Sequence, residues 1–314
     1  MQPTNVGPFV ACALLVLPVA TQAATLGGHV ETGIEYDSNL TVNELDQASG
    51  KSDQALVVGA GAEASGQPLE NLTLTGTYDF TSRRYQSYES FDQDIHLASV
   101  DLSYQIDSVT LGASHYYAYA TLASRSFLDY NRSSLYVGKR MDDDVYVMAS
   151  LLSKRKSFDQ SEARDARTRG VSLDGFFFYN QSRTLFVLGL DGDDENASSD
   201  AYDYRMVAGR SRLKHRFSVS GHDNTLQLGV RYEARDYDEP VSSAEDPVFP
   251  VFGPGVTSSE PRSDRIVTAD VSWAVGLTDW LTTKAKLERI DYRSTLDSAD
   301  YDKTVASLTL RADF

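Results

Sequence analysis

Side chains that could carry out acid–base or nucleophilic catalysis are few and scattered in this sequence of 314 residues. The five histidines are His29, His96, His115, His215 and His222. Ser114-His115 are neighbours, but neighbouring residues of a strand point to opposite faces, and His222-Asp223 falls in a short turn. A nucleophile must lie within hydrogen-bond reach of its base. We therefore predict no enzyme and no catalytic residue.

Composition excludes further classes of protein. The formal net charge of −16 argues against a nucleic-acid partner, which needs a basic surface. A single cysteine, Cys12, leaves neither a disulfide scaffold nor a cysteine-rich metal site. We predict no metal and no cofactor. Beyond residue 23, no apolar run reaches the roughly 18 residues that a membrane-spanning helix needs.

Charged residues recur at every second position in several segments, which is the spacing of one face of a β-strand. In segment 204–219 the other parity carries Val207, Leu213 and Phe217, so the charged parity faces away from an apolar surface. The basic face predicted in this way comprises Arg210, Arg212, Lys214, Arg216, Arg231, Arg235, Lys284 and Lys286. Segments nearer the N-terminus supply an acidic face, which comprises Glu31, Glu35, Glu63, Asp79 and Asp101.

The elements that must position these faces are strands, because apolar and polar residues alternate along most of the chain. Segment 72–80 (LTLTGTYDF) and segment 226–235 (LQLGVRYEAR) each have one apolar and one polar side. Pro68 and Pro240 bound a long proline-free stretch, as ladder hydrogen bonding requires. The pattern predicts 14 strands: 28–37, 54–65, 71–82, 94–105, 109–120, 132–140, 145–155, 168–179, 183–191, 204–219, 225–237, 264–276, 280–292 and 303–314.

Residues 1–23 have the composition of a secretory signal peptide, with an uncharged apolar stretch from Phe9 to Ala20 and small residues at Ala23 and Ala24. We expect cleavage after Ala23, which leaves residues 24–314 as one domain without cysteine. An exported chain of this kind fits the envelope of a Gram-negative bacterium.

Alternating short and long connections predict a transmembrane antiparallel β-barrel with short periplasmic turns and long extracellular loops. Strands of about ten residues match a tilted crossing of the hydrocarbon layer, where backbone groups must pair with each other in a closed sheet. The last strand resembles the C-terminal assembly signal of outer-membrane proteins through Leu308, Leu310 and Phe314. The expected location is the outer membrane, and the expected partners are its lipids, lipopolysaccharide and the barrel-assembly machinery. The alternative fold is a secreted β-sandwich.

Two short motifs resemble a known class of barrels. Segment 33–39 (GIEYDSN) runs from a strand into a Tyr-Asp-Ser-Asn turn, and segment 231–238 (RYEARDYD) ends in Asp-Tyr-Asp. Both are similar to the barrel domain of surface lipoprotein assembly modifiers and to exopolysaccharide-associated β-barrel porins. The modifiers usually carry a helical-repeat region before the barrel, whereas here the first predicted strand follows the signal within a few residues. This departure argues against a modifier role and favours a stand-alone channel.

If the apolar faces meet lipid, the charged faces line a lumen. In a ring of 14 strands, 204–219 stands opposite 71–82, so the basic face would confront the acidic one and sort charged solutes. The predicted function is a porin-like channel for polar and anionic solutes. One alternative is an export or assembly barrel for a surface polysaccharide or lipoprotein. Another is that the charges pair within the wall and fill the lumen.

Two loops are candidates for more specialised roles. The five-proline loop 238–263 contains Val248, Phe249, Val251 and Phe252, whose apolar side chains predict an inward fold that constricts the pore. The alternative is a mobile loop or a contact with lipopolysaccharide or a neighbouring subunit. Segment 191–203 is dense in Asp and Glu and is expected to be a loop. It is either a Ca²⁺ site or, as we favour, a solvated loop that divalent ions bridge to lipopolysaccharide.

Overall fold

The computed structural model describes residues 24–42, 45–159, 161–240 and 260–314. Fourteen long strands form the wall: β1 (Thr25–Asp37), β4 (Asp53–Leu69), β5 (Leu72–Tyr85), β6 (Gln93–Ile106), β7 (Val109–Leu122), β8 (Arg125–Arg140), β9 (Val145–Phe158), β10 (Ala166–Tyr179), β11 (Thr184–Ala197), β12 (Tyr204–Val219), β13 (His222–Tyr237), β14 (Ser263–Gly276), β15 (Leu281–Ser294) and β16 (Tyr301–Asp313). Two short strands, β2 (Thr41–Val42) and β3 (Gln47–Ala48), pair within the first loop. No helix in these ranges is long and apolar enough to cross a membrane.

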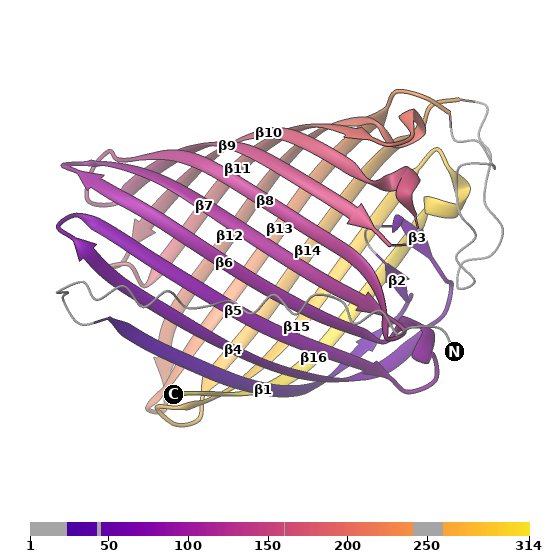
Figure 1. The fold of residues 1–314 in the computed structure, drawn as a ribbon. Helices are drawn as coiled ribbons and strands as arrows, with labels where there is room; N and C mark the ends of the chain where they lie inside the picture. Colours follow the sequence, from indigo (N-terminus) through magenta and orange to yellow (C-terminus); the bar gives the residue numbers. More distant parts are fainter. Residues whose placement is uncertain (1–23, 43–44, 160, 241–259) are drawn as a thin grey trace, which may run out of the picture.

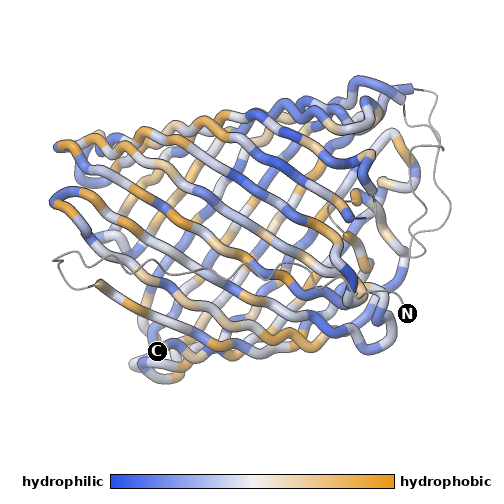
Figure 2. The backbone as a smooth tube through the Cα atoms, viewed as in Figure 1, coloured by the Kyte–Doolittle hydropathy of each residue, from blue (hydrophilic) through white to orange (hydrophobic). Residues whose placement is uncertain are grey.

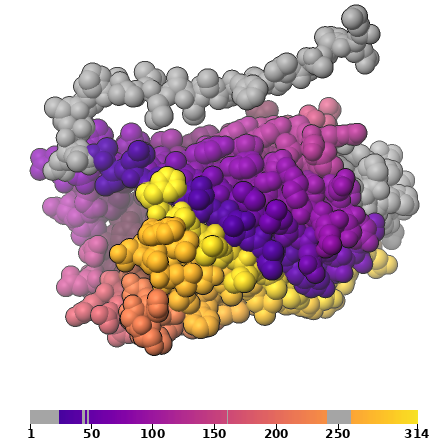
Figure 3. Space-filling view, turned by 90° about the horizontal axis from the view of Figure 1, so that it is seen from below, coloured from indigo at the N-terminus to yellow at the C-terminus, as the bar shows by residue number. Residues whose placement is uncertain are grey.

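The wall is a closed antiparallel barrel in which each strand pairs with its neighbours in sequence (Figure 1). Closure joins β1 to β16, with Ile34 opposite Leu308. Gly28 and Phe314 exchange both of their backbone hydrogen bonds, at 2.8 and 2.9 Å. Figure 3 shows the yellow C-terminal strand beside the indigo N-terminal one. The predicted barrel of 14 strands is confirmed, and its alternative, a sandwich, is wrong.

Alternation places apolar residues on the outside of the barrel. Large apolar side chains such as Ile34, Leu135, Leu151 and Leu190 are 60–64% exposed there. Such an exposed apolar band is the surface that an outer-membrane barrel presents to lipid. Hydrophobic and hydrophilic residues interleave along each strand in Figure 2. The polar parity therefore faces the interior of the barrel.

The two ends of the barrel differ. One end carries the short connections 70–71, 107–108, 141–144, 180–183, 220–221 and 277–280. The other end carries most of the longer connections, and four of these contain a 3₁₀ turn: η2 (Glu89–Phe91), η3 (Glu162–Arg164), η4 (Asp200–Tyr202) and η5 (Asp297–Ala299).

Two connections at the long-loop end are shorter than the sequence predicts. β7 and β8 are joined only by Ala123 and Ser124, both with positive φ, so the expected loop 121–131 is wrong. β11 continues to Ala197, so most of the expected acidic loop 191–203 is strand. The end of β11 escaped detection because polar residues occupy both of its faces there. At the start of β8 the adjacent buried residues Phe127 and Leu128, beside a register shift, break the alternation.

Candidate functional site

The lumen contains a cavity of about 1,080 Å³ whose lining comes from the strands β6 to β15. Its basic side chains are Arg132, Arg210, Arg212, Lys214, Arg231, Lys284 and Lys286. Its acidic side chains are Asp101, Asp174, Asp270 and Glu288. Seven basic groups thus stand against four acidic ones among the lining residues, although the whole chain is strongly acidic.

The basic side chains of the cavity fall into two groups. Arg210 is held by Asp174 and Asp191, and Lys286 lies 2.7 Å from Glu288. In contrast, Arg132, Arg212, Lys214 and Lys284 have no ion-pair partner among the residues that the structure describes. The second group therefore leaves its positive charge available to a solute in the lumen.

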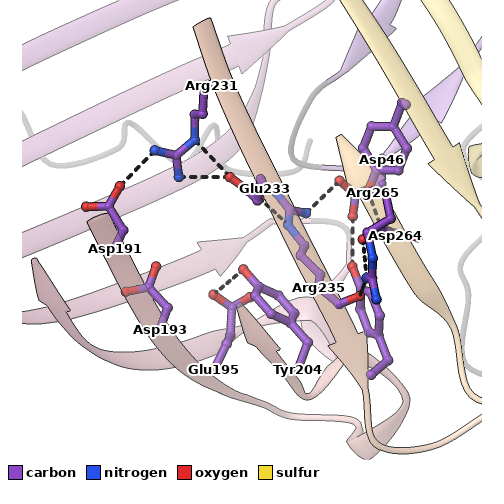
Figure 4. Close-up of polar contacts among 12 residues, drawn as sticks. Asp46, Asp191, Asp193, Glu195, Tyr204, Arg231, Glu233, Arg235, Asp264 and Arg265 are labelled. Atoms are coloured by element: carbon purple, nitrogen blue, oxygen red, sulfur yellow. Dashed lines mark hydrogen bonds and ion pairs between the residues drawn. The ribbon is translucent and has the colours of Figure 1, made fainter. Parts of the chain in front are cut away.

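A chain of ion pairs runs from the cavity towards the long-loop end (Figure 4). Arg231 lies 2.9 Å from Asp191 and 2.8 Å from Glu233, and Glu233 lies 2.5 Å from Arg235. Because β-strand residues two apart share a face, Arg231, Glu233 and Arg235 of β13 line up along the inner wall. Arg231 and Arg235 are thus neutralised by carboxylates of the wall. The alternative interpretation in the sequence analysis expected such pairing for all of the charged residues.

The chain of ion pairs ends on a residue of the first loop, Asp46. Its carboxylate lies 3.1 Å from Arg235 and 3.5 Å from Arg262, and the hydroxyl of Tyr237 donates to it at 3.5 Å. Asp46 has φ of +51°, a conformation that aspartate tolerates better than most residues. Burial opposes ionisation of this carboxyl, but Arg235, Arg262, Arg164 and Lys156 outweigh burial and hold its pKa below the usual range.

Loop 38–52 crosses the long-loop end of the barrel. Its Leu40, Val42 and Leu45 are at most 3% exposed. They join a cluster with Ala55, Tyr85, Phe91, Phe127, Leu128 and Phe158, from β4, β5, η2, β8 and β9. On the other side, Ala48 packs against a second cluster that includes Ile266, Tyr292 and Tyr301. Figure 1 shows β2 and β3 at this end of the barrel.

This buried first loop at the long-loop end was missed by sequence reasoning. The sequence analysis assigned constriction to Val248, Phe249, Val251 and Phe252, which lie outside the described residues. The available sequence evidence was the apolar spacing of Leu40, Val42 and Leu45 within a connection. Lys303 of β16 fastens the start of the loop, with its ammonium 2.8 Å from both Asp37 and the Thr41 hydroxyl.

The remaining predicted basic residues lie at the two ends of the lumen. Arg235 lines a smaller cavity of about 460 Å³ beside the first loop, together with Asp46, Tyr204 and Tyr237. Arg216 lies near the short-turn end, where it donates to the carbonyl of Ser182 at 2.8 Å.

The predicted acidic residues are divided between two regions. Glu35 lies 3.3 Å from Arg83, and Asp79 lies 3.7 Å from His29. Glu63 and Asp79 line a separate cavity with Arg311 and Asp313, and Asp101 accepts a hydrogen bond from Tyr136 at 3.0 Å. Glu31 packs beside Gly59 of β4. β12 and β5 stand on opposite sides of the ring. The prediction that a basic face confronts an acidic face across the lumen requires this placement.

The acidic run is not a solvated loop. Asp191, Asp193 and Glu195 project from β11 into the lumen, where Asp193 lies 2.5 Å from Lys154 and Glu195 lies 2.8 Å from Lys156. Tyr204 also donates to Glu195 at 3.0 Å (Figure 4). These three carboxylates form ion pairs with lysine and arginine, and a contact of the run with divalent ions or lipopolysaccharide stays a prediction. Within the described ranges, no cluster of three or more His, Cys, Asp or Glu could hold a metal.

The histidines lie on five strands, β1, β6, β7, β12 and β13. His96 belongs to an outward aromatic group, with its Nδ1 2.8 Å from the Tyr78 hydroxyl and its ring 4.9 Å from that of Phe80. His115 contacts the Ser133 hydroxyl at 2.9 Å. At the C-terminus, Leu308, Leu310 and Phe314 are 52%, 42% and 79% exposed, and their role in assembly stays a prediction.

Comparisons with known proteins identify the fold alone. No protein-family model matches the sequence, and no curated protein matches it. The trimer form of OmpT, an outer membrane protein of Vibrio cholerae, has a TM-score of 0.54 at 10% identity, over 93% of this chain and 100% of that one. An anion-selective porin from Comamonas acidovorans has a TM-score of 0.50 at 10% identity, over 93% and 99%. The chain thus has an outer-membrane β-barrel fold, and the resemblance to lipoprotein assembly modifiers stays a prediction.

Proposed function

We propose that this protein is a channel of the Gram-negative outer membrane that passes small anionic solutes. The observation that carries the proposal is the cavity of the lumen, in which Arg132, Arg212, Lys214 and Lys284 lack an ion-pair partner among the described residues. In a narrow passage with low-dielectric walls, uncompensated basic side chains attract anions and repel cations. No catalytic group is needed for this function.

The first loop sets the size of solute that the channel admits. Leu40, Val42 and Leu45 occupy space at the long-loop end, and Asp46 holds them there through Arg235 and Arg262. A solute must pass between this loop and the wall before it reaches the basic cavity. The arrangement favours small solutes, for which the two features act in series as a size filter and a charge filter.

Reversal potentials in planar bilayers under a KCl gradient test the proposal. The wild-type protein should conduct and should favour chloride over potassium. The triple variant R212Q, K214Q and K284Q should lose most of that preference, because it removes only unpaired positive charges of the lumen. Lys139→Gln, which removes an outward-facing charge of β8, is the matched control and should behave as wild type. A protein without conductance, or a triple variant with unchanged selectivity, contradicts the proposal.

A further inference from the structure

Three arginines form a basic patch on the outer face of β9 and β10, near the long-loop end. Arg155, Arg167 and Arg169 are all exposed. Arg155 stands directly opposite Arg167 in the antiparallel pairing, and Arg169 lies two residues further along β10 on the same face. Like charges directly opposite each other on neighbouring strands are destabilising. The patch therefore has an unfavourable arrangement unless an anion occupies it.

Outward-facing arginines elsewhere near this end are neutralised by the protein itself. Arg84 lies 2.7 Å from Asp94, Arg265 lies 3.1 Å from Asp236, and Arg289 lies 2.5 Å from Asp302. Arg155, Arg167 and Arg169 have no such partner within the described part of the chain. The three arginines of the β9–β10 flank thus differ from Arg84, Arg265 and Arg289, each of which has a carboxylate partner.

Three carboxylates near the patch make other contacts. Asp165 accepts hydrogen bonds from the Phe158 amide at 2.6 Å and the Ser157 hydroxyl at 3.1 Å. Asp203 accepts them from the Ala197 amide and the Asn196 side chain. Asp194, which stands opposite Arg169, lies 3.5 Å from Arg205. None of these three carboxylates forms an ion pair with Arg155, Arg167 or Arg169.

The patch borders the apolar band of the barrel. Leu151 and Val171 stand opposite each other on β9 and β10, 64% and 55% exposed on the outer face. Arg169 lies two residues beyond Val171 on that face, about 7 Å along the strand. Hydrophilic residues become frequent on these strands towards the long-loop end (Figure 2). Guanidinium groups at this height meet the headgroups of a surrounding bilayer.

We propose that Arg155, Arg167 and Arg169 bind phosphate groups of a phosphorylated glycolipid in the outer leaflet, the chemistry of lipopolysaccharide. Guanidinium groups bind phosphate bidentately, and neighbouring arginines can share one phosphate, which relieves the Arg155–Arg167 repulsion. This inference rests on the outer-membrane location in the proposed function. It does not depend on conduction or on any residue of the lumen.

The test measures glycolipid binding by the full mature chain in detergent. Three probes are titrated: lipid A with its phosphates, the same lipid after dephosphorylation, and inorganic phosphate. The patch variant is R155Q, R167Q and R169Q, and a second variant places lysine at the same three positions. The matched control R84Q, R265Q and R289Q removes equally many outward arginines, but from ion pairs. Retention of the folded form in unheated gel electrophoresis verifies that each variant is a barrel.

The patch variant should lose about a hundredfold in affinity for phosphorylated lipid A, because each basic side chain at an anionic lipid surface contributes about fivefold. The lysine variant should lose less, and the control should stay near wild type. The inference is overturned if the patch variant and the control lose affinity equally. It is also overturned if the wild-type protein binds dephosphorylated lipid A or inorganic phosphate as tightly as phosphorylated lipid A. Conductance of the patch variant should be unchanged, so a failed channel proposal and a failed lipid site give different results.

Discussion

The carboxylate of Asp46 lies 3.1 Å from the guanidinium of Arg235, 189 residues further along the chain. This contact joins the first loop to the inner wall at β13. It matters for function because the same loop buries Leu40, Val42 and Leu45 across the long-loop end. The docking of this loop therefore depends on a buried ion pair as well as on apolar packing.

Asp46→Ala should release the first loop. Breaking a buried ion pair by removing one partner costs about 3–5 kcal/mol, and here that cost falls on the docking of the loop. We expect higher single-channel conductance and faster hydrogen exchange at the amide of Ser49, which donates to the Leu40 carbonyl at 3.0 Å. Asp302→Ala, which removes a half-exposed carboxylate of the outer face, is the control. Conductance equal to wild type in Asp46→Ala would show that the loop does not limit the pore.

Docking of the loop should depend on pH only in acid. The folded-state pKa of Asp46 is lowered, so the stabilisation is fully present above the ordinary carboxyl pKa of about 3.9 and declines as pH falls below it. Conductance should be constant from neutral pH to about pH 4 and rise below that. Asp46→Asn should lack this rise. A rise of the same size in Asp46→Asn would assign the acid effect to other groups.

Arg210 and Arg212 should respond differently to substitution, although they share one face of β12. Arg210→Gln leaves Asp174, which is 4% exposed, without its cation. The expected cost is about 2 kcal/mol of unfolding free energy, and the uncompensated Asp174 carboxylate should also lower the preference for anions. Arg212→Gln should lower the preference for anions without this loss of stability, since no ion pair holds Arg212 in the described structure. Urea unfolding in lipid vesicles and reversal potentials measure the two effects, and identical behaviour would refute the division into paired and unpaired groups.

Gly33→Ala should weaken the closure between β1 and β16. A Cβ atom at Gly33 would lie 2.5 Å from the Leu308 carbonyl oxygen and 2.9 Å from the Cα of Thr309, so the backbone must move. We expect a loss of about 1–3 kcal/mol in unfolding free energy. At Gly76 the nearest atom would be 3.8 Å away, which makes Gly76→Ala the matched control. Equal stability of the two variants in urea would contradict this account of the closure.

The wall of the barrel was predictable from sequence because lipid and lumen impose opposite requirements on alternate residues. Segments such as 72–80 carry apolar residues for the lipid and polar residues for the lumen at alternate positions, and they fall within observed strands. The prediction weakened towards the long-loop end, where residues outside the apolar band are polar on both faces. The acidic run at Asp191, Asp193 and Glu195 is an example, because its sequence matches a loop. Its partners Lys154 and Lys156 lie on β9, two strands away, and Arg210 lies on the adjacent β12.

The candidate site was predictable only in part. Parity identified Arg212, Lys214 and Lys284, which line the cavity. It could not separate them from Arg210 or Arg231, because ion pairing depends on which strands are adjacent and on their register. The inward course of the first loop depends on contacts between Asp46 and residues near 235 and 262, and local sequence carries no record of such distant partners.

The first loop starts at β1, ends at β4, rests on Phe127 and Phe158 of β8 and β9, and is bonded to Arg235 of β13. Three separate sectors of the rim are thereby braced against one another. A barrel wall held only by hydrogen bonds between strands deforms easily when lateral pressure is uneven, whereas contacts across its interior resist the deformation. The first loop should therefore also keep the barrel opening circular.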